Sequence, residues 1–167
     1  MIHYAHHSTP IGRLLMNSDG RALTGLHFVD EKHVPRVAHD WQYDPDLPVF
    51  VRTRAQLDEY FAGNRRDFDV PILPGGTEFQ RRVWAVLCEI PYGATTSYGA
   101  MAKRLGQPTA SRAVGAANGR NPISIIVPCH RAIGADGSLT GYAGGLERKQ
   151  ALLQLEAATM PLFAGSR

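Results

Sequence analysis

The feature that most constrains this chain is a break in its pattern between Pro71 and Gly76, near the middle of its 167 residues. Two prolines and two glycines there end the alternation of apolar and polar residues. The charge balance changes sign at the same point, because residues 1–72 carry −2 and residues 73–167 carry +5, which together give the net charge of +3. The break therefore predicts two small domains and a tail. Their expected bounds are 1–74, 75–160 and 161–167.

The part before the break is typical of a small antiparallel sheet with one helix. Apolar residues alternate with polar ones in four short segments, at 2–4, 14–16, 26–28 and 68–72. Between the third and fourth segments, an apolar stripe over 50–61 predicts a helix, which Gly63 would end. The stretch 30–48 has no clear period.

The part after the break predicts a mostly helical domain, so the whole chain belongs to the mixed α/β (α+β) class. Four helices are expected, at 79–90, 98–105, 111–118 and 146–156. Thr77 with Gln80 three residues later has the form of a capping box at the start of the first. The tight turn between the second and third predicts a helix-turn-helix at about 97–119. A short β-prone run follows at 125–128.

Composition excludes several classes of protein. No apolar run is long enough to cross a bilayer and no leader is recognisable, so we expect a soluble, cytoplasmic chain. The two cysteines, Cys88 and Cys129, lie in segments of different character, which argues against a disulfide. Neither has a second cysteine at ligand spacing, so we expect no metal and no cofactor. The basic second half favours a polyanionic partner, although a solvated basic face explains the charge as well.

The segment most informative about chemistry is Pro128-Cys129-His130-Arg131. Six of the seven histidines lie in the first 39 residues, so the only histidine of the second half stands beside a cysteine. A neighbouring imidazole and guanidinium both favour the thiolate, which makes Cys129 a candidate nucleophile. The alternative is a buried thiol that only packs, which is commoner for a lone cysteine and suits Cys88 in its apolar helical stripe.

His130 is the candidate base for this cysteine. Adjacent side chains in an extended chain point to opposite sides, so a bridging water between His130 and Cys129 is more plausible than a direct contact. A histidine base also needs its second ring nitrogen held, usually by a carboxylate. Glu156 on the last helix is one of only five acids in this half, although it suits a solvated helix end equally well.

The predicted helix-turn-helix offers a second group of candidates. Arg112 lies at its reading end, and Tyr98 begins the preceding helix. Small residues surround them, at Ala110, Ala113, Gly115, Ala116, Ala117 and Gly119. A helix lined with Ala and Gly can approach another backbone closely, as insertion into a narrow groove of DNA requires. A helix packed tightly on a protein core would have the same composition.

A glycine-rich stretch from Gly134 to Gly145 is the third candidate. Its backbone groups would suit the wall of a pocket for a planar base. The stretch lacks the spacing of a phosphate-binding loop, and it suits equally a loop that needs positive φ angles.

Several motifs in this order resemble one known family, the O6-alkylguanine-DNA alkyltransferases. The run Asn121-Pro122-Ile123-Ser124-Ile125-Ile126-Val127-Pro128-Cys129-His130-Arg131 is similar throughout to the active-site signature of that family. Five further motifs match: Phe79-Gln80 with Val83-Trp84, Ile90-Pro91-Tyr92-Gly93, Ser97-Tyr98-Gly99, Ser111-Arg112-Ala113-Val114-Gly115 and Thr140-Gly141-Tyr142-Ala143-Gly144-Gly145. The resemblance is nearly continuous from Gly76 to Glu156 and weaker before it.

The resemblance implies a single-turnover DNA repair methyltransferase that acts on O6-alkylguanine, with O4-alkylthymine as a second candidate substrate. Cys129 would accept the alkyl group by SN2 attack on a flipped base. His130 would take the thiol proton through a water, Glu156 would orient His130, and Asn121 would support the turn. The fold implied is a ribonuclease H-like α/β domain followed by a winged-helix-like domain that carries the active site.

The partner implied is alkylated double-stranded DNA, bound in the minor groove by a monomer. Tyr98 would rotate the nucleotide and donate a proton to the departing base, and Arg112 would fill the space left in the stack. The other residues expected at the DNA are Ser111, Ala113, Gly115 and Ala117. Those expected around the flipped base are Ala132, Tyr142, Ala143 and Gly144.

Two departures and two alternatives stand beside this resemblance. Some relatives carry a zinc site built partly from cysteines in the first domain, but no cysteine precedes Cys88 here. Related binding proteins lack the acceptor cysteine, whereas Cys129 is present. The alternatives are a DNA-binding regulator with a structural or redox-sensing Cys129 and a cysteine hydrolase that turns over repeatedly.

Overall fold

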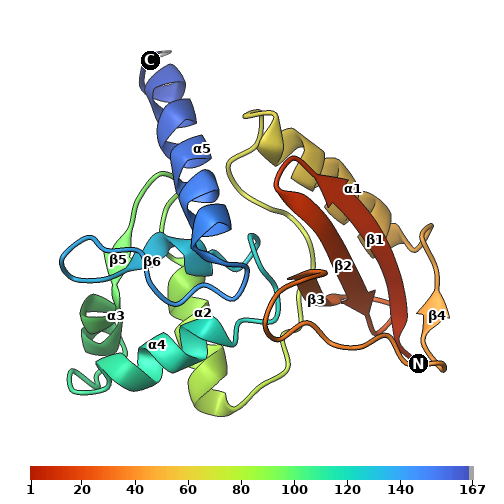
Figure 1. The fold of residues 1–167 in the computed structure, drawn as a ribbon, viewed down its shortest axis with the longest axis horizontal. Helices are drawn as coiled ribbons and strands as arrows, with labels where there is room; N and C mark the ends of the chain where they lie inside the picture. The colour runs from red at the N-terminus through yellow and green to blue at the C-terminus, as the bar shows by residue number, and fades with distance from the viewer. Residues whose placement is uncertain (166–167) are drawn as a thin grey trace. The chain divides into compact units, whose positions relative to one another are not determined.

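The chain forms two compact units in a computed structural model that describes the backbone of residues 1–165 and the side chains of residues 1–159 (Figure 1). Unit 1 comprises Met1–Gly75 and the short segment Pro122–Ser124. Unit 2 comprises the other described residues, from Gly76–Asn121 and from Ile125 onward. Both kinds of secondary structure are present, as the mixed fold class requires.

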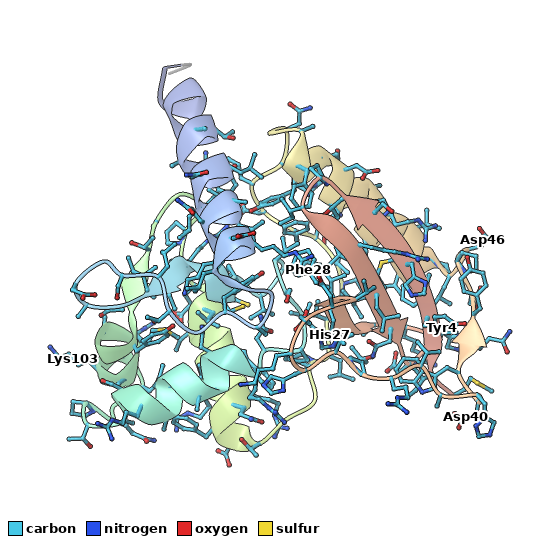
Figure 2. All side chains as sticks on the ribbon, viewed as in Figure 1. Tyr4, His27, Phe28, Asp40, Asp46 and Lys103 are labelled. Atoms are coloured by element: carbon cyan, nitrogen blue, oxygen red, sulfur yellow. The ribbon has the colours of Figure 1, made fainter. Side chains whose placement is uncertain are left out.

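Unit 1 is built on a four-stranded sheet in the order β3-β2-β1-β4. The strands are β1 (His3–Thr9), β2 (Gly12–Ser18), β3 (Leu23–Phe28) and β4 (Gln42–Tyr43). The first three pair antiparallel, which confirms the first three predicted strands, whereas β4 pairs parallel to β1 and was not predicted. The ring of Tyr43 on β4 lies 5.4 Å from that of Tyr4 on β1, the residue labelled in Figure 2.

One helix, α1 (Pro48–Phe61), packs beside β1 and closes the core of unit 1. Ala62 follows it as the C-cap, and Gly63 then turns the chain at φ 79°, a left-handed conformation that glycine adopts without strain. Helix and sheet together bury a set of large apolar side chains: Leu14, Met16, Leu23, Leu26, Phe28, Phe50, Leu57 and Tyr60. The expected helix at 50–61 is confirmed.

The fourth predicted strand, at 68–72, does not form. Asp69 gives its backbone N–H to Gln56 Oε1 at 2.8 Å and accepts from Gln56 Nε2 at 3.1 Å, so a side chain replaces the neighbouring strand. Pro71 has no N–H to donate. Only Ile72 forms a bridge, to Leu23.

Unit 2 is mostly helical. Its helices are α2 (Glu78–Cys88), α3 (Tyr98–Arg104), α4 (Ser111–Gly119) and α5 (Leu146–Gly165), with a short 3-10 turn, η1 (Cys129–Arg131). A two-stranded parallel pair, β5 (Thr96–Ser97) and β6 (Ala132–Ile133), was not predicted. Two residues per strand are too few to produce a period in the sequence.

Local signals in the sequence position these helices. Thr77 and Gln80 form the predicted capping box on α2, and Ser97 Oγ accepts from the N–H of Ala100 at the start of α3. The indole of Trp84, buried on α2, donates to the carbonyl of Ala117 on α4 at 2.9 Å. This bond fixes α4 against α2.

Three expectations in unit 2 are wrong. Residues 125–128 form no strand, because Ile125 takes a left-handed conformation at φ 72° that interrupts an extended chain. The last helix continues beyond 156 through most of the expected tail at 161–167, of which 166–167 lie outside the described residues. Cys88 is exposed at the end of α2, and therefore is not the packed thiol that its apolar neighbours indicated.

Candidate active site

The turn that leads to Cys129 is held from inside by Asn121. Its Nδ2 donates to the carbonyl of Val127 at 2.8 Å, and the same carbonyl accepts from the N–H of Cys129 at 2.8 Å. The positive φ of Ile125 is costly for a β-branched residue, so the surrounding structure must hold it in place. Cys129 is 4% exposed at the first position of η1.

A second asparagine, which the sequence did not indicate, also contacts this turn. Asn118 is buried near the end of α4, and its Nδ2 donates to the carbonyl of Cys129 at 3.3 Å. The helix that contains Arg112 therefore touches the cysteine directly. Asn118 lies among small residues, whose spacing does not show which face of the helix is buried. The sequence therefore gave no reason to expect a buried asparagine here.

His130 and Glu156 form a buried pair at the centre of unit 2. His130 Nε2 lies 2.7 Å from Glu156 Oε2, and the side chains are 0% and 1% exposed. Glu156 is thus not a solvated helix-end residue. His130 Nδ1 has no hydrogen-bond partner among the described residues.

The charges of this pair follow from its surroundings. Burial lowers the pKa of His130 below 6.5 and outweighs the opposite effect of Glu156, so the imidazole is neutral near pH 7. Burial alone would raise the pKa of Glu156, but hydrogen bonds from His130 and Arg131 lower it to about 2. A neutral imidazole that donates from Nε2 to a carboxylate keeps its proton there, which leaves Nδ1 as an acceptor.

The guanidinium of Arg131, which the sequence suggested would favour the Cys129 thiolate, binds other groups. Its Nε and Nη2 donate to the two oxygens of Glu156 at 2.9 and 3.1 Å, and its Nη1 donates to the carbonyl of Ile90 at 2.7 Å. Its guanidinium also lies 5.7 Å from the centre of the Tyr92 ring. Arg131 therefore neutralises Glu156 and anchors the end of η1.

Tyr98, at the start of α3, reaches across to the glycine-rich stretch. Its hydroxyl donates to the carbonyl of Thr140 at 3.0 Å. A Cβ placed on Gly141, which has φ 66°, would come within 3.1 Å of that hydroxyl, and one on Gly115 would lie 3.9 Å from the ring. Gly141 thus leaves room for the Tyr98 hydroxyl, whereas a side chain at Gly115 would make only ordinary contact with the ring.

Lys149 is a buried cation that sequence reasoning missed. Its Nζ donates to the carbonyl of Ala132 at 2.5 Å and to that of Thr140 at 2.6 Å. Its position on α5, seven residues before Glu156, places both on one helix face, which is the signal that would have found it.

The predicted DNA-facing residues on α4 separate into two groups. Arg112 and Ala113 are exposed, and Ser111 and Gly115 are half-buried. Ala117 is buried and its carbonyl is occupied by Trp84, so its side chain belongs to the core rather than to the exposed face. Of the residues expected around a base, Ala132 and Tyr142 are buried, and Ala143 and Gly144 are half-buried.

The described part of the chain lacks two further features, a metal-binding cluster and a membrane-spanning helix. It contains no group of three His, Cys, Asp or Glu residues arranged to hold a metal ion. None of its helices is long and apolar enough to span a membrane.

Two family models together match nearly the whole chain. Residues 2–74 match the ribonuclease-like domain of 6-O-methylguanine DNA methyltransferase, and residues 78–158 match its DNA-binding domain. The chain belongs to the 6-O-methylguanine DNA methyltransferase family. The expected family and the expected pair of folds are therefore confirmed.

Named relatives and solved structures of this family align with almost all of the chain. The methylated-DNA–protein-cysteine methyltransferase of Mycobacterium bovis is 50% identical over 96% of each chain. That of Methanosarcina acetivorans is 50% identical over 94% of this chain and 99% of its own. The crystal structure of Mycobacterium tuberculosis O6-methylguanine methyltransferase is 49% identical, with a TM-score of 0.88 over 98% of this chain and 99% of its own. A structure of Mycobacterium tuberculosis OGT in complex with DNA has a TM-score of 0.87 at 49% identity, over 94% of each chain.

Proposed function

We propose that this chain repairs DNA by moving an alkyl group from O6 of guanine to the sulfur of Cys129, once per protein molecule. The observation that carries the proposal is a buried Cys129 next in the chain to a neutral His130. Glu156 binds Nε2 of this imidazole, and its Nδ1 forms no hydrogen bond with the described residues and can accept a proton. This is the arrangement that activates a thiol without a permanent positive charge on the base. The names of the relatives, at 50% identity over nearly the whole chain, agree with it.

The reaction is a single displacement. His130 Nδ1 accepts the thiol proton through a bridging water, and the Cys129 thiolate attacks the alkyl carbon in line with the C–O6 bond. The S–C bond forms as the C–O6 bond breaks, and guanine leaves with the electron pair on O6. Tyr98 supplies a proton to the departing base. The thioether bond is not readily cleaved, so each protein molecule reacts only once.

The exposed side of α3 and α4 is the proposed DNA surface. An alkylated O6 is inaccessible inside a duplex, so the nucleotide must be rotated out, and Arg112 would occupy the gap. Ser111, Ala113 and Gly115 are small enough for α4 to enter the minor groove. Lys103 projects outward from α3 and would attract phosphates (Figure 2). The complex of Mycobacterium tuberculosis OGT with DNA supports this choice of partner.

The flipped base is proposed to lie against the segment after β6. Tyr142 is buried there, with Ala143 and Gly144 beside it, and Ala132 lies on β6 immediately after η1. Backbone groups of this segment would read the base edge. O4-alkylthymine is a second candidate substrate for the same chemistry.

The proposal extends to the domain boundary, the compartment and the oligomeric state. The functional domains would divide at about residue 74, with the helix-turn-helix at 97–119. A chain that needs a reduced thiol is suited to the cytoplasm, where disulfides are rare. We propose that it acts there as a monomer, since the reaction needs one thiol and one lesion.

Intact-mass spectrometry after incubation with duplex DNA that contains one O6-methylguanine tests the function. The expected result is a gain of one methyl group per protein on the peptide that contains Cys129, with saturation at that value. Cys129→Ala is expected to bind the duplex without any transfer. An unmodified wild-type protein that still binds would favour a DNA-binding module, and repeated turnover would favour a hydrolase.

A further inference from the structure

Lys149 is a fully buried lysine on α5 that the reaction described above does not use. Its Nζ donates to the carbonyl of Ala132 at 2.5 Å and to that of Thr140 at 2.6 Å. Burial of an ammonium group costs free energy that an apolar side chain of similar length would not cost. The hydrogen bonds to these two carbonyls are therefore what distinguishes a lysine here from a methionine.

The two carbonyls come from segments of different character. Ala132 is buried on β6, whereas Thr140 is exposed within the glycine-rich stretch. The tip between them is closed by its own backbone, since the N–H of Gly134 donates to the carbonyl of Ser138 at 2.8 Å. Thr140 lies beyond this closure, so Lys149 ties it to a helix and to a buried strand. An exposed segment that would otherwise be mobile thereby gains a fixed point.

The carbonyl of Thr140 also receives the hydroxyl of Tyr98. This hydroxyl donates to it at 3.0 Å, and Thr140 Oγ1 lies 3.5 Å from the same hydroxyl. A carbonyl oxygen has two lone pairs, so Lys149 and Tyr98 together occupy both. The position of this one carbonyl therefore decides where the Tyr98 hydroxyl lies, and Lys149 holds the carbonyl in that position.

The arrangement places the Tyr98 hydroxyl without binding it tightly. A distance of 3.0 Å is at the long end for a hydrogen bond between a hydroxyl and a carbonyl. The charge-assisted bond from Lys149, at 2.6 Å, is the stronger of the two. The hydroxyl can therefore turn from the carbonyl toward a base that enters, while the carbonyl stays in place.

We propose that Lys149 is a positioning residue of the transfer reaction: its ammonium fixes the carbonyl of Thr140, and that carbonyl holds the hydroxyl of Tyr98 where the departing base can take its proton. Without the ammonium, the carbonyl and the hydroxyl lose their common anchor to α5. The inference rests on the proposed function, in which Tyr98 supplies that proton.

A double-mutant cycle tests whether Lys149 acts through Tyr98. Methyl transfer from duplex DNA with one O6-methylguanine is timed by intact mass for the parent, Lys149→Met, Tyr98→Phe and the protein with both changes. Lys149→Met should slow transfer by at least about tenfold, because a small displacement of a reacting group is costly. In the Tyr98→Phe background the same change should have little further effect, since the hydroxyl is already absent. Lys32→Met, the same change at an exposed lysine, should match the parent.

Two outcomes of this cycle overturn the proposal. Equal effects of Lys149→Met with and without the Tyr98 hydroxyl would mean that the lysine acts independently of Tyr98. An equal loss in iodoacetamide alkylation, measured in a Cys88→Ser background where Cys129 is the one remaining thiol, would place the effect at the acceptor sulfur instead. Melting temperatures establish that each variant is folded at the temperature of the assay.

A spectroscopic measurement keeps the test decisive if Lys149→Met does not fold, and it does not depend on transfer. The chain has three lysines, whose side-chain signals can be assigned by NMR with ¹³C-labelled lysine. Tyr98→Phe removes one donor from the carbonyl of Thr140, so the signal of Lys149 should shift, with smaller changes at Lys32 and Lys103. No shift at Lys149 overturns the proposal. If the chain takes no methyl from DNA but this shift occurs, the proposed function fails and the positioning of Tyr98 by Lys149 stands.

Discussion

His130 Nε2 and Glu156 Oε2 lie 2.7 Å apart with both side chains closed to solvent, and this contact leaves Nδ1 as the ring nitrogen that can accept a proton. Because the same carboxylate also binds Arg131 through both of its oxygens, its charge is already balanced. The pair can therefore orient a neutral base in a place where an isolated carboxylate would be too costly.

Glu156→Gln is expected to weaken both the fold and the transfer. The change leaves the buried Arg131 without its counter-charge, so the free energy of unfolding should fall by about 3–5 kcal/mol. Chemical denaturation measures this, and methyl transfer at a temperature where the variant is folded measures the second effect. Glu147→Gln, in the exposed first turn of the same helix, is the control and should change neither quantity.

Acid should destabilise the chain in two stages. Burial holds the pKa of His130 below its ordinary 6.5, so the unfolded chain takes up that proton first and stability begins to fall as the pH drops below 6.5. The pKa of Glu156 is about 2 against an ordinary 4.5, so its contribution is full above pH 4.5 and is lost as the pH falls from 4.5 toward 2. Denaturation curves at a series of pH values show both stages. Glu156→Gln should abolish the second, and a parent protein equally stable at pH 3 and pH 7 would refute this account.

Gly141→Ala should displace the Tyr98 hydroxyl and thereby slow methyl transfer. Gly141 and Gly137 both have positive φ, so alanine at either costs about 1 kcal/mol in backbone strain. Only at Gly141 would the new Cβ lie 3.1 Å from the Tyr98 hydroxyl, whereas at Gly137 nothing lies within 4 Å. Methyl transfer from duplex DNA should therefore slow more in Gly141→Ala than in Gly137→Ala at similar melting temperatures. Equal rates would mean that the contact is irrelevant to transfer.

Arg112→Ala should slow repair of duplex DNA without affecting the thiol. Arg112 is exposed in the first turn of α4, whereas the contact of this helix with the Cys129 carbonyl comes from Asn118 near its other end. If it fills the space of a flipped nucleotide, its loss should lower the rate with duplex substrate by at least about tenfold, while iodoacetamide alkylation of Cys129 stays unchanged. Arg52→Ala, an exposed arginine on α1, is the matched control for charge. A comparable loss in Arg52→Ala would indicate a general charge effect.

The elements that the sequence predicted correctly are those with a local cause. Three such signals act within four residues of the chain, and can therefore be recognised from the sequence alone: the capping box of Thr77 and Gln80, the N-cap Ser97 and the glycine after α1. The motif around Cys129 was legible for the same reason, since its residues are adjacent in the chain. The missed strands β4, β5 and β6 are two residues long, and exist only because a distant partner lies beside them.

By itself, the sequence determined the two-part organisation and most of the helix boundaries, and it singled out Cys129 as the proposed acceptor with His130 beside it. Only the tertiary structure decided which groups compensate one another: that Arg131 serves Glu156, that Asn118 holds the Cys129 carbonyl, that Ala117 faces the core, and that Lys149 is buried beside the site. The physical reason is that burial and pairing of a polar side chain depend on segments far away in the chain, 11 and 41 residues away in two of these contacts. Spacing can place two residues such as Lys149 and Glu156 on one helix face, but it does not record which groups from distant segments they contact. Desolvation makes those contacts decisive once the chain has folded.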